Sequence, residues 1–136
     1  MTAHIYLFFN GNCEEAMNFY KDALHGEIIS ISRYGEAPMG ASDAYKDKVL
    51  NGVLKAGESL IYFSDSSEGQ RVTTGDEFSV ALNFESADET DAAFAAISAG
   101  GNITMPLQDT FWNARFGMCT DKFGIKWMFN YDKPKV

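Results

Sequence analysis

The sequence repeats itself once, and this repeat constrains the fold more than any other feature. A shift of 75 positions aligns Phe9 with Phe84, Glu14 with Glu89, Phe19 with Phe94, Gly26 with Gly101 and Ile28 with Ile103. Near the end of each half, Gly57-Glu-Ser-Leu-Ile-Tyr-Phe-Ser-Asp65 resembles Gly124-Ile-Lys-Trp-Met-Phe-Asn-Tyr-Asp132 at a shift of 67. A two-fold repeat with a period of about 65 to 75 residues predicts two copies of one supersecondary unit.

The first copy, residues 1–70, is predicted to run strand, helix and three strands. Asn12, with Glu15 three residues later, is expected to cap the helix, and Gly26 is expected to end it in the left-handed conformation. One apolar helical face is predicted from the spacing of Ala16, Phe19, Tyr20, Ala23 and Leu24. The expected strands are 5–9, 27–33, 49–54 and 59–64, around a helix at 13–24.

The second copy, residues 76–136, repeats this order. Ser86-Ala-Asp-Glu89 has the capping-box pattern and opens a helix that is predicted to run through Ala99 and to end at Gly100-Gly101. The expected strands are 78–84, 103–107, 113–120 and 125–131. The fold class is therefore α+β, with two tandem βαβββ modules in a single domain. Between strands of the first copy, residues 34–47 form a polar loop that is either a lid or a plain excursion.

Composition excludes several classes of partner. The 136 residues carry a net charge of −8, which disfavours nucleic acids and anionic membrane surfaces. No apolar run approaches the roughly 20 residues that span a bilayer, and Met1–Phe9 has the pattern of a first strand and not of a signal peptide. Cys13 and Cys119 form no CxxC pair. We therefore expect a cytoplasmic protein in a reducing compartment.

Three stretches resemble the PhnB-like branch of the vicinal-oxygen-chelate superfamily, which includes glyoxalases, bleomycin-resistance proteins and dihydroxybiphenyl dioxygenases. The first is Tyr6-Leu-Phe-Phe-Asn-Gly-Asn-Cys-Glu-Glu-Ala-Met-Asn-Phe-Tyr20, followed by Leu24-His-Gly-Glu27. The second comprises Phe111-Trp112 and Arg115-Phe-Gly117, and the third is Thr120-Asp-Lys-Phe-Gly-Ile-Lys-Trp127. The resemblance implies modules that curl into half-barrels around a concave pocket, and it implies a homodimer.

Metal-dependent members of this superfamily take one ligand from the first strand and one from the fourth strand of each module. The resemblance places these four positions at Ile5 or His4, Ile61 or Tyr62, Ser79 or Val80, and Met128 or Trp127. Only His4 is a good ligand for a divalent ion. We therefore expect no metal and no other cofactor.

The remaining polar residues offer little acid-base chemistry. Asp65 and Asp132 lie at equivalent strand ends and indicate turns, and Asp121 suits a hairpin turn. His25 is expected at the end of a helix, close to its last carbonyl groups. Cys119 has no basic neighbour in the pattern and is interpreted as a small core residue. No catalytic residue is predicted.

Aromatic and thioether side chains dominate the expected pocket, and strand alternation lets only about half of them face one cavity. The candidates are Phe8, Tyr62, Trp112, Phe116, Met118, Trp127 and Phe129, with Arg115, Gln108 and Asn51 as polar partners. The ligand-binding residues that we predict are Trp112, Arg115, Phe116, Met118, Tyr62, Gln108 and Asn51.

The favoured function is a dimeric protein that binds a small, partly aromatic or amphipathic molecule without a metal. One alternative is a metal-dependent isomerase, lyase or dioxygenase whose ligands lie elsewhere. Another is a non-catalytic interaction scaffold.

Overall fold

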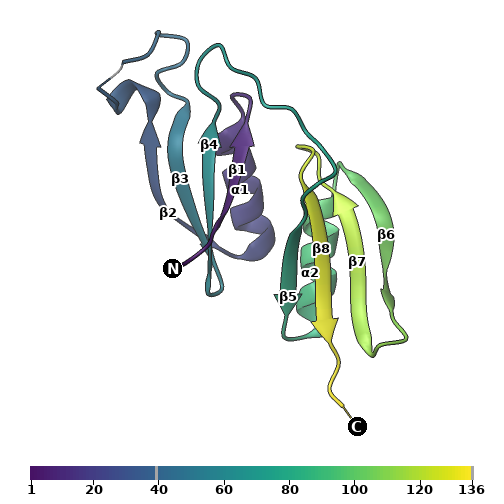
Figure 1. Cartoon of the computed structure of the whole chain (residues 1–136). Coiled ribbons are helices and arrows are strands. Elements are labelled where there is room, and N and C mark those ends of the chain that lie inside the picture. Colours follow the sequence, from purple (N-terminus) through teal and green to yellow (C-terminus); the bar gives the residue numbers. More distant parts are fainter. Residues whose placement is uncertain (39, 136) are drawn as a thin grey trace. The chain divides into compact units, whose positions relative to one another are not determined.

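A computed structural model describes residues 1–38 and 40–135. The chain forms two compact units, Met1–Thr73 and Thr74–Val136. Each unit contains one four-stranded sheet and one α-helix, and unit 1 has in addition a short 3-10 helix at Tyr34–Glu36 (Figure 1). The strand-helix-three-strand order occurs in both units, so the predicted α+β fold of two βαβββ copies is confirmed.

Unit 1 contains β1 (Ile5–Phe9), α1 (Cys13–Leu24), β2 (Glu27–Arg33), β3 (Val49–Ala56) and β4 (Ser59–Asp65). Its strand order is β1-β4-β3-β2. The first strand pairs in parallel with the fourth, and the other two pairings are antiparallel. The parallel pairing is possible because α1 and the β2–β3 hairpin lie between β1 and β4 in the chain and supply the long crossover that it requires.

Unit 2 repeats this topology. It contains β5 (Val80–Phe84), α2 (Ala87–Ser98), β6 (Asn102–Asp109), β7 (Ala114–Thr120) and β8 (Lys126–Asp132), in the order β5-β8-β7-β6. Again only the outer β5–β8 pairing is parallel. Both sheets therefore keep two unpaired edges and do not close on themselves.

One face of each sheet carries the helix and the core, and we call the other face the open face. In unit 1, Tyr20 of α1 stacks on Phe63 of β4, and the two ring centroids are 6.0 Å apart. In unit 2, Phe94 of α2 meets Phe129 of β8 edge to face at 5.1 Å. Alternate residues of each strand point to opposite faces. The neighbours of these core residues along the strands therefore lie on the open face.

The buried side of α1 differs from the sequence prediction. Ala16, Tyr20 and Ala23 are buried as expected, whereas Phe19 and Leu24 are only half-buried. Cys13 and Met17 take their places in the core. Met17 packs closely over Gly52 of β3, where an added Cβ atom would lie 2.5 Å from the Met17 side chain.

The end of α1 corrects a second expectation. His25, and not Gly26, has the left-handed conformation, with φ of 52°. Gly26 is needed for space, since a Cβ atom there would lie 2.7 Å from the carbonyl oxygen of Lys55. Its repeat mate Gly101 is in the same situation, with the carbonyl oxygen of Thr120 at 2.3 Å. Glycine recurs at this position of the repeat because the backbone there passes too close to a neighbouring strand for a side chain to fit.

The two helix starts differ as well. Ser86 caps α2 as predicted, because its side chain accepts the N–H of Glu89 at 3.1 Å. Asn12 occupies the capping position of α1 but makes no side-chain capping bond, so that prediction is wrong. The carboxylate of Asp65 replaces it and accepts the N–H groups of Gly11 and Cys13 at 2.8 and 3.0 Å.

The loop at 34–47 is fastened at both ends. Tyr34 is buried, and its hydroxyl donates to the carbonyl oxygen of Asp65 at 2.7 Å. The N–H of Gly35 donates to the carbonyl oxygen of Lys46 at 2.9 Å, and the hydroxyl of Tyr45 donates to the backbone carbonyl oxygen of Ser66. These bonds make the base of the loop part of unit 1.

Candidate functional site

The open face of unit 1 bears a row of aromatic rings. Tyr6 stacks on Phe8 at 5.0 Å and on Tyr62 at 5.8 Å, measured between ring centroids. The imidazole of His4 lies edge-on to Tyr62 at 4.9 Å. Tyr6 and Phe8 are 41% and 50% exposed, so solvent reaches these two rings in the single chain.

One polar group from the neighbouring strand is fixed against these rings. The hydroxyl of Tyr6 donates to the side-chain oxygen of Asn51 at 2.5 Å. Partial burial, with smaller contributions from nearby groups such as Cys13, raises the pKa of Tyr6, so the phenol keeps its proton at neutral pH. The bond uses one lone pair of the Asn51 oxygen, and the amide nitrogen retains two donors for another acceptor.

The open face of unit 2 combines rings with thioethers. Gly117 of β7 faces α2, because a Cβ atom there would meet Phe94 at 3.0 Å. Its neighbours Phe116 and Met118 therefore point to the open face. Gln108 of β6 is directly opposite Phe116. The ring centroids of Trp112 and Phe116 are 6.1 Å apart. Four of the predicted ligand-binding residues thus share one surface of unit 2.

Trp127 and Phe129, which the sequence offered as further pocket candidates, are on the other side. Both are fully buried in the core of unit 2. The indole N–H of Trp127 donates to Asp121 at 2.8 Å. The same carboxylate accepts the N–H groups of Phe123 and Ile125 at 2.8 and 3.0 Å. The segment that carried much of the family resemblance therefore has a structural role, and the hairpin-turn interpretation of Asp121 agrees with these bonds.

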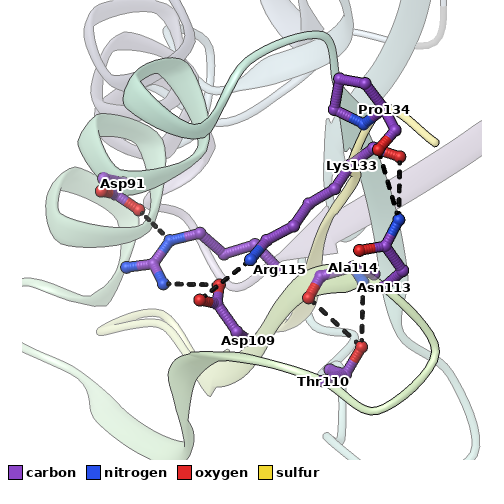
Figure 2. A network of polar contacts seen from close by, with 8 residues as sticks. All are labelled: Asp91, Asp109, Thr110, Asn113, Ala114, Arg115, Lys133 and Pro134. Carbon is purple, nitrogen blue, oxygen red and sulfur yellow. Dashed lines mark hydrogen bonds and ion pairs between the residues drawn. The ribbon is translucent and has the colours of Figure 1, made fainter. Parts of the chain in front are cut away.

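Arg115 also lies apart from the other predicted ligand-binding residues. Figure 2 shows its guanidinium between two carboxylates on the side of the sheet that carries α2. Its Nε lies 2.6 Å from Asp91 of α2, and its Nη1 lies 3.4 Å from Asp109 of β6. These partners hold the pKa of Arg115 above its usual value. The side chain thus ties β7 to α2 in this structure.

The turn that presents Trp112 is held by the same network. Asn113 has φ of 63°, and its side chain donates to the carbonyl oxygens of Lys133 and Pro134, each at 3.4 Å (Figure 2). Thr110 closes the turn through bonds to Ala114. The indole is 53% exposed, but its supporting backbone is fixed by several hydrogen bonds.

The positions that would hold a divalent metal in relatives do not provide its donors. Ile5 and Ile61 face the core of unit 1, which leaves His4 and Tyr62 on the open face. In unit 2 the corresponding strand positions supply Ser79 and the thioether of Met128. One imidazole with hydroxyl and thioether groups does not fit a hard or borderline ion. Within residues 1–38 and 40–135, no three His, Cys, Asp or Glu side chains are grouped for metal binding.

Neither thiol is arranged for nucleophilic chemistry. Burial, assisted by the nearby Asp121, raises the pKa of Cys119 to about 11. Burial likewise raises the pKa of Cys13, with Asp65 and Glu14 contributing. Both thiols therefore remain protonated at neutral pH. Cys119 is buried, as the sequence interpretation expected.

Sequence reasoning missed Tyr6 as a site residue. Its signal was the alternation along β1, where Leu7 and Phe9 are buried and Tyr6 and Phe8 are exposed. An unbroken run of apolar residues conceals this alternation, because aromatic residues occupy both faces of the strand. The sequence also contains no sign that Tyr6 pairs with Asn51, 45 residues away.

Two βαβββ units, each with a helix on one face and an exposed aromatic or thioether surface on the other, define a glyoxalase-like α+β protein. Residues 2–129 match the family model described as the glyoxalase/bleomycin resistance protein/dioxygenase superfamily. The chain belongs to this superfamily.

Similar proteins extend over nearly the whole chain. Protein YjdN of Escherichia coli strain K12 is 30% identical over 140 residues, which cover 96% of this chain and 95% of that protein. The crystal structure of protein PA1353 from Pseudomonas aeruginosa matches with a TM-score of 0.89 and 36% identity, over 98% and 99% of the two chains. The PhnB protein from Bacillus cereus matches with a TM-score of 0.80 and 30% identity, over 96% and 99%. The PhnB-like resemblance is thereby confirmed.

Among the described residues, no helix has the length and apolar character to cross a membrane.

Proposed function

We propose that this protein is a homodimeric, cytoplasmic binding protein that holds a small, partly aromatic or amphipathic molecule on its open faces without a metal. The observation that carries the proposal is the stack of Tyr6, Phe8 and the half-buried Tyr62 on the sheet face opposite α1, in which Tyr6 and Phe8 are exposed. Large apolar walls with a few fixed polar groups are the usual composition of small-molecule sites. Membership of a superfamily whose name includes bleomycin resistance is consistent with such binding.

The chemistry of the two open faces indicates the kind of ligand. Aromatic rings on both open faces favour flat aromatic groups, through offset stacking or edge contacts. These rings belong to Tyr6 and Tyr62 in unit 1 and to Phe116 and Trp112 in unit 2. Asn51 and Gln108 add amide donors and acceptors on the respective faces. A planar molecule with one or two hydrogen-bonding groups satisfies both features. The prediction that Arg115 contacts the ligand would require its side chain to leave Asp91 and Asp109 and the side of the sheet that carries α2.

Replacing a ring on either open face should weaken ligand binding. For an aromatic ligand found by a thermal-shift screen, we expect Tyr62→Ala and Trp112→Ala each to cost about 1 to 3 kcal/mol of binding free energy, the range of aromatic contact residues. Isothermal titration calorimetry measures this change. The matched control is Phe78→Ala, since Phe78 is 78% exposed and precedes β5 outside the stacked rings. Equal losses in all three variants, or none in the first two, would contradict the assignment.

The homodimer is expected because each unit exposes apolar side chains that a second copy would cover, including Ile29 in unit 1 and Ile103 in unit 2. Stable homodimers generally bury more than about 1,200 Å² in total. Sedimentation equilibrium at micromolar concentration should return twice the mass of one 136-residue chain. A monomer under these conditions would rule out the dimer and leave the ligand proposal standing.

A cytoplasmic location is supported by two buried free thiols, Cys13 and Cys119, which suit a reducing compartment.

The metal-free part of the proposal is tested by elemental analysis. After dialysis against nickel, zinc or manganese, we expect well under one ion per chain. One tightly held ion per chain, lost in a His4→Ala variant, would favour a metal-dependent isomerase, lyase or dioxygenase.

A further inference from the structure

Three methionines lie side by side across the open face of unit 2. Met105 of β6 is directly opposite Met118 of β7, and Met118 is directly opposite Met128 of β8. On the far side of Met128, the partner in β5 is the small residue Ala81. The three thioethers therefore form an uninterrupted row over three strands, with a small side chain at one end.

All three side chains point away from the core. Gly117 and Cys119 flank Met118 along β7 and are both buried, and Trp127 and Phe129 flank Met128 in the same way. Met105 shares the face of Met118 because directly opposite residues of a ladder point to the same side. The three methionines are partly exposed, neither fully buried nor fully exposed.

The spacing suits convergence of the three sulfur atoms. Directly opposite residues of an antiparallel pair have Cβ atoms about 4.5 to 5.5 Å apart. β6 and β8 flank β7 and lie about 10 Å from each other, twice the usual strand spacing. Methionine is unbranched and has three rotatable side-chain bonds, so Met105 and Met128 can lean toward Met118 without moving the backbone. The pairing register of β6 with β7 shifts on each side of Met105.

We infer that Met105, Met118 and Met128 form a binding site for a soft monovalent cation, Cu(I) or its analogue Ag(I). Thioether sulfur is a soft ligand that selects Cu(I) over hard and borderline ions. The net charge of −8 favours any cation at the surface. The site uses unit 2 alone. It shares Met118 with the predicted ligand-binding residues, but its test uses the metal ion alone, without the organic ligand.

Titration of the full-length protein with silver nitrate in chloride-free buffer tests the site, with labelled methionine methyl groups observed by NMR. Of the six methionines, those at 105, 118 and 128 should shift and saturate at one Ag(I) per chain. Competition with a chromophoric Cu(I) chelator under anaerobic conditions should show that Met118→Leu weakens Cu(I) binding at least tenfold. Leucine has nearly the volume of methionine but no donor.

The matched control is Met17→Leu. Met17 lies on α1 and is buried against β3 in unit 1, so this change should leave Cu(I) and Ag(I) binding unchanged. Affinity no greater than that of free methionine would overturn the site, as would methyl shifts confined to other methionines. Binding that survives Met118→Leu but is lost in Cys119→Ala would assign the ion to the thiol and would also overturn it. If Met118→Leu does not fold, the wild-type methyl spectrum decides.

Discussion

Replacing Asp65 with Ala should destabilise unit 1 more than any other single change of a polar residue that we propose. The Asp65 side chain is only 1% exposed. Its Oδ1 accepts the N–H groups of Gly11 and Cys13, and its Oδ2 accepts that of Val49 at 2.9 Å. The carboxylate thus joins the start of α1 to the start of β3.

The magnitude follows from the three donors that would lose their acceptor. A buried N–H without a partner costs about 1 to 3 kcal/mol, so Asp65→Ala should lower the free energy of unfolding by about 3 kcal/mol or more. Asp65→Asn should have a smaller effect, because it keeps an oxygen for Gly11 and Cys13 and loses only the bond to Val49. Urea unfolding followed by circular dichroism measures both variants.

Asp132 provides the control, since it occupies the equivalent strand end in the repeat. It is exposed, and the hydrogen bond recorded for its side chain comes from Asn130 at 3.1 Å. We expect Asp132→Ala to leave the unfolding midpoint nearly unchanged. Similar midpoints for the Asp65 and Asp132 variants would mean that the buried carboxylate does not organise unit 1.

The second large effect is expected at Trp127. It is the largest fully buried side chain of the chain's described part, and Trp127→Ala should cost about 3 to 5 kcal/mol of unfolding free energy through the cavity that it leaves. Its indole N–H also satisfies the buried Asp121 at 2.8 Å. Unfolding is followed by circular dichroism and not by tryptophan fluorescence, because the substitution removes one of only two tryptophans and leaves Trp112 as the other.

A double-mutant cycle separates the hydrogen bond from the packing. Combining Trp127→Phe with Asp121→Asn should give a coupling free energy of about 1.5 to 3 kcal/mol, as for hydrogen bonds to charged groups. Trp112→Phe is the control, since that indole is half-exposed and should have little effect on unfolding. A coupling near zero would show that the indole contributes only its volume.

Local pattern was sufficient for the elements of this fold. β1 and β2 begin and end where the apolar runs and turn residues place them, and α2 starts at the capping box of Ser86. These features depend on neighbours within a few residues, which the sequence displays directly. The repeat then implied that both halves share one topology, and both sheets have the same strand order.

The open-face residues were predicted less completely. Tyr62, Asn51, Phe116 and Gln108 were proposed from the sequence, and each lies on the open face of its unit. Trp127 and Phe129 were also pocket candidates but lie in the core, because a strand rich in aromatic residues on both faces does not reveal which set meets the helix. Arg115 was chosen as a ligand contact, and only the folded chain brings Asp91 within 2.6 Å of it.

The sequence by itself determined the repeat, the family and, to within two residues, the limits of the predicted elements. Tertiary structure alone decided which face of each strand is buried and which distant groups meet. Asp65 and Asp132 are equivalent in the repeat, yet only Asp65 is buried, where it receives N–H groups from segments 16 and more than 50 residues away. The three methionines are likewise separated by ten or more positions and become neighbours only through strand register. Such partners depend on pairing between strands, and no local pattern encodes it.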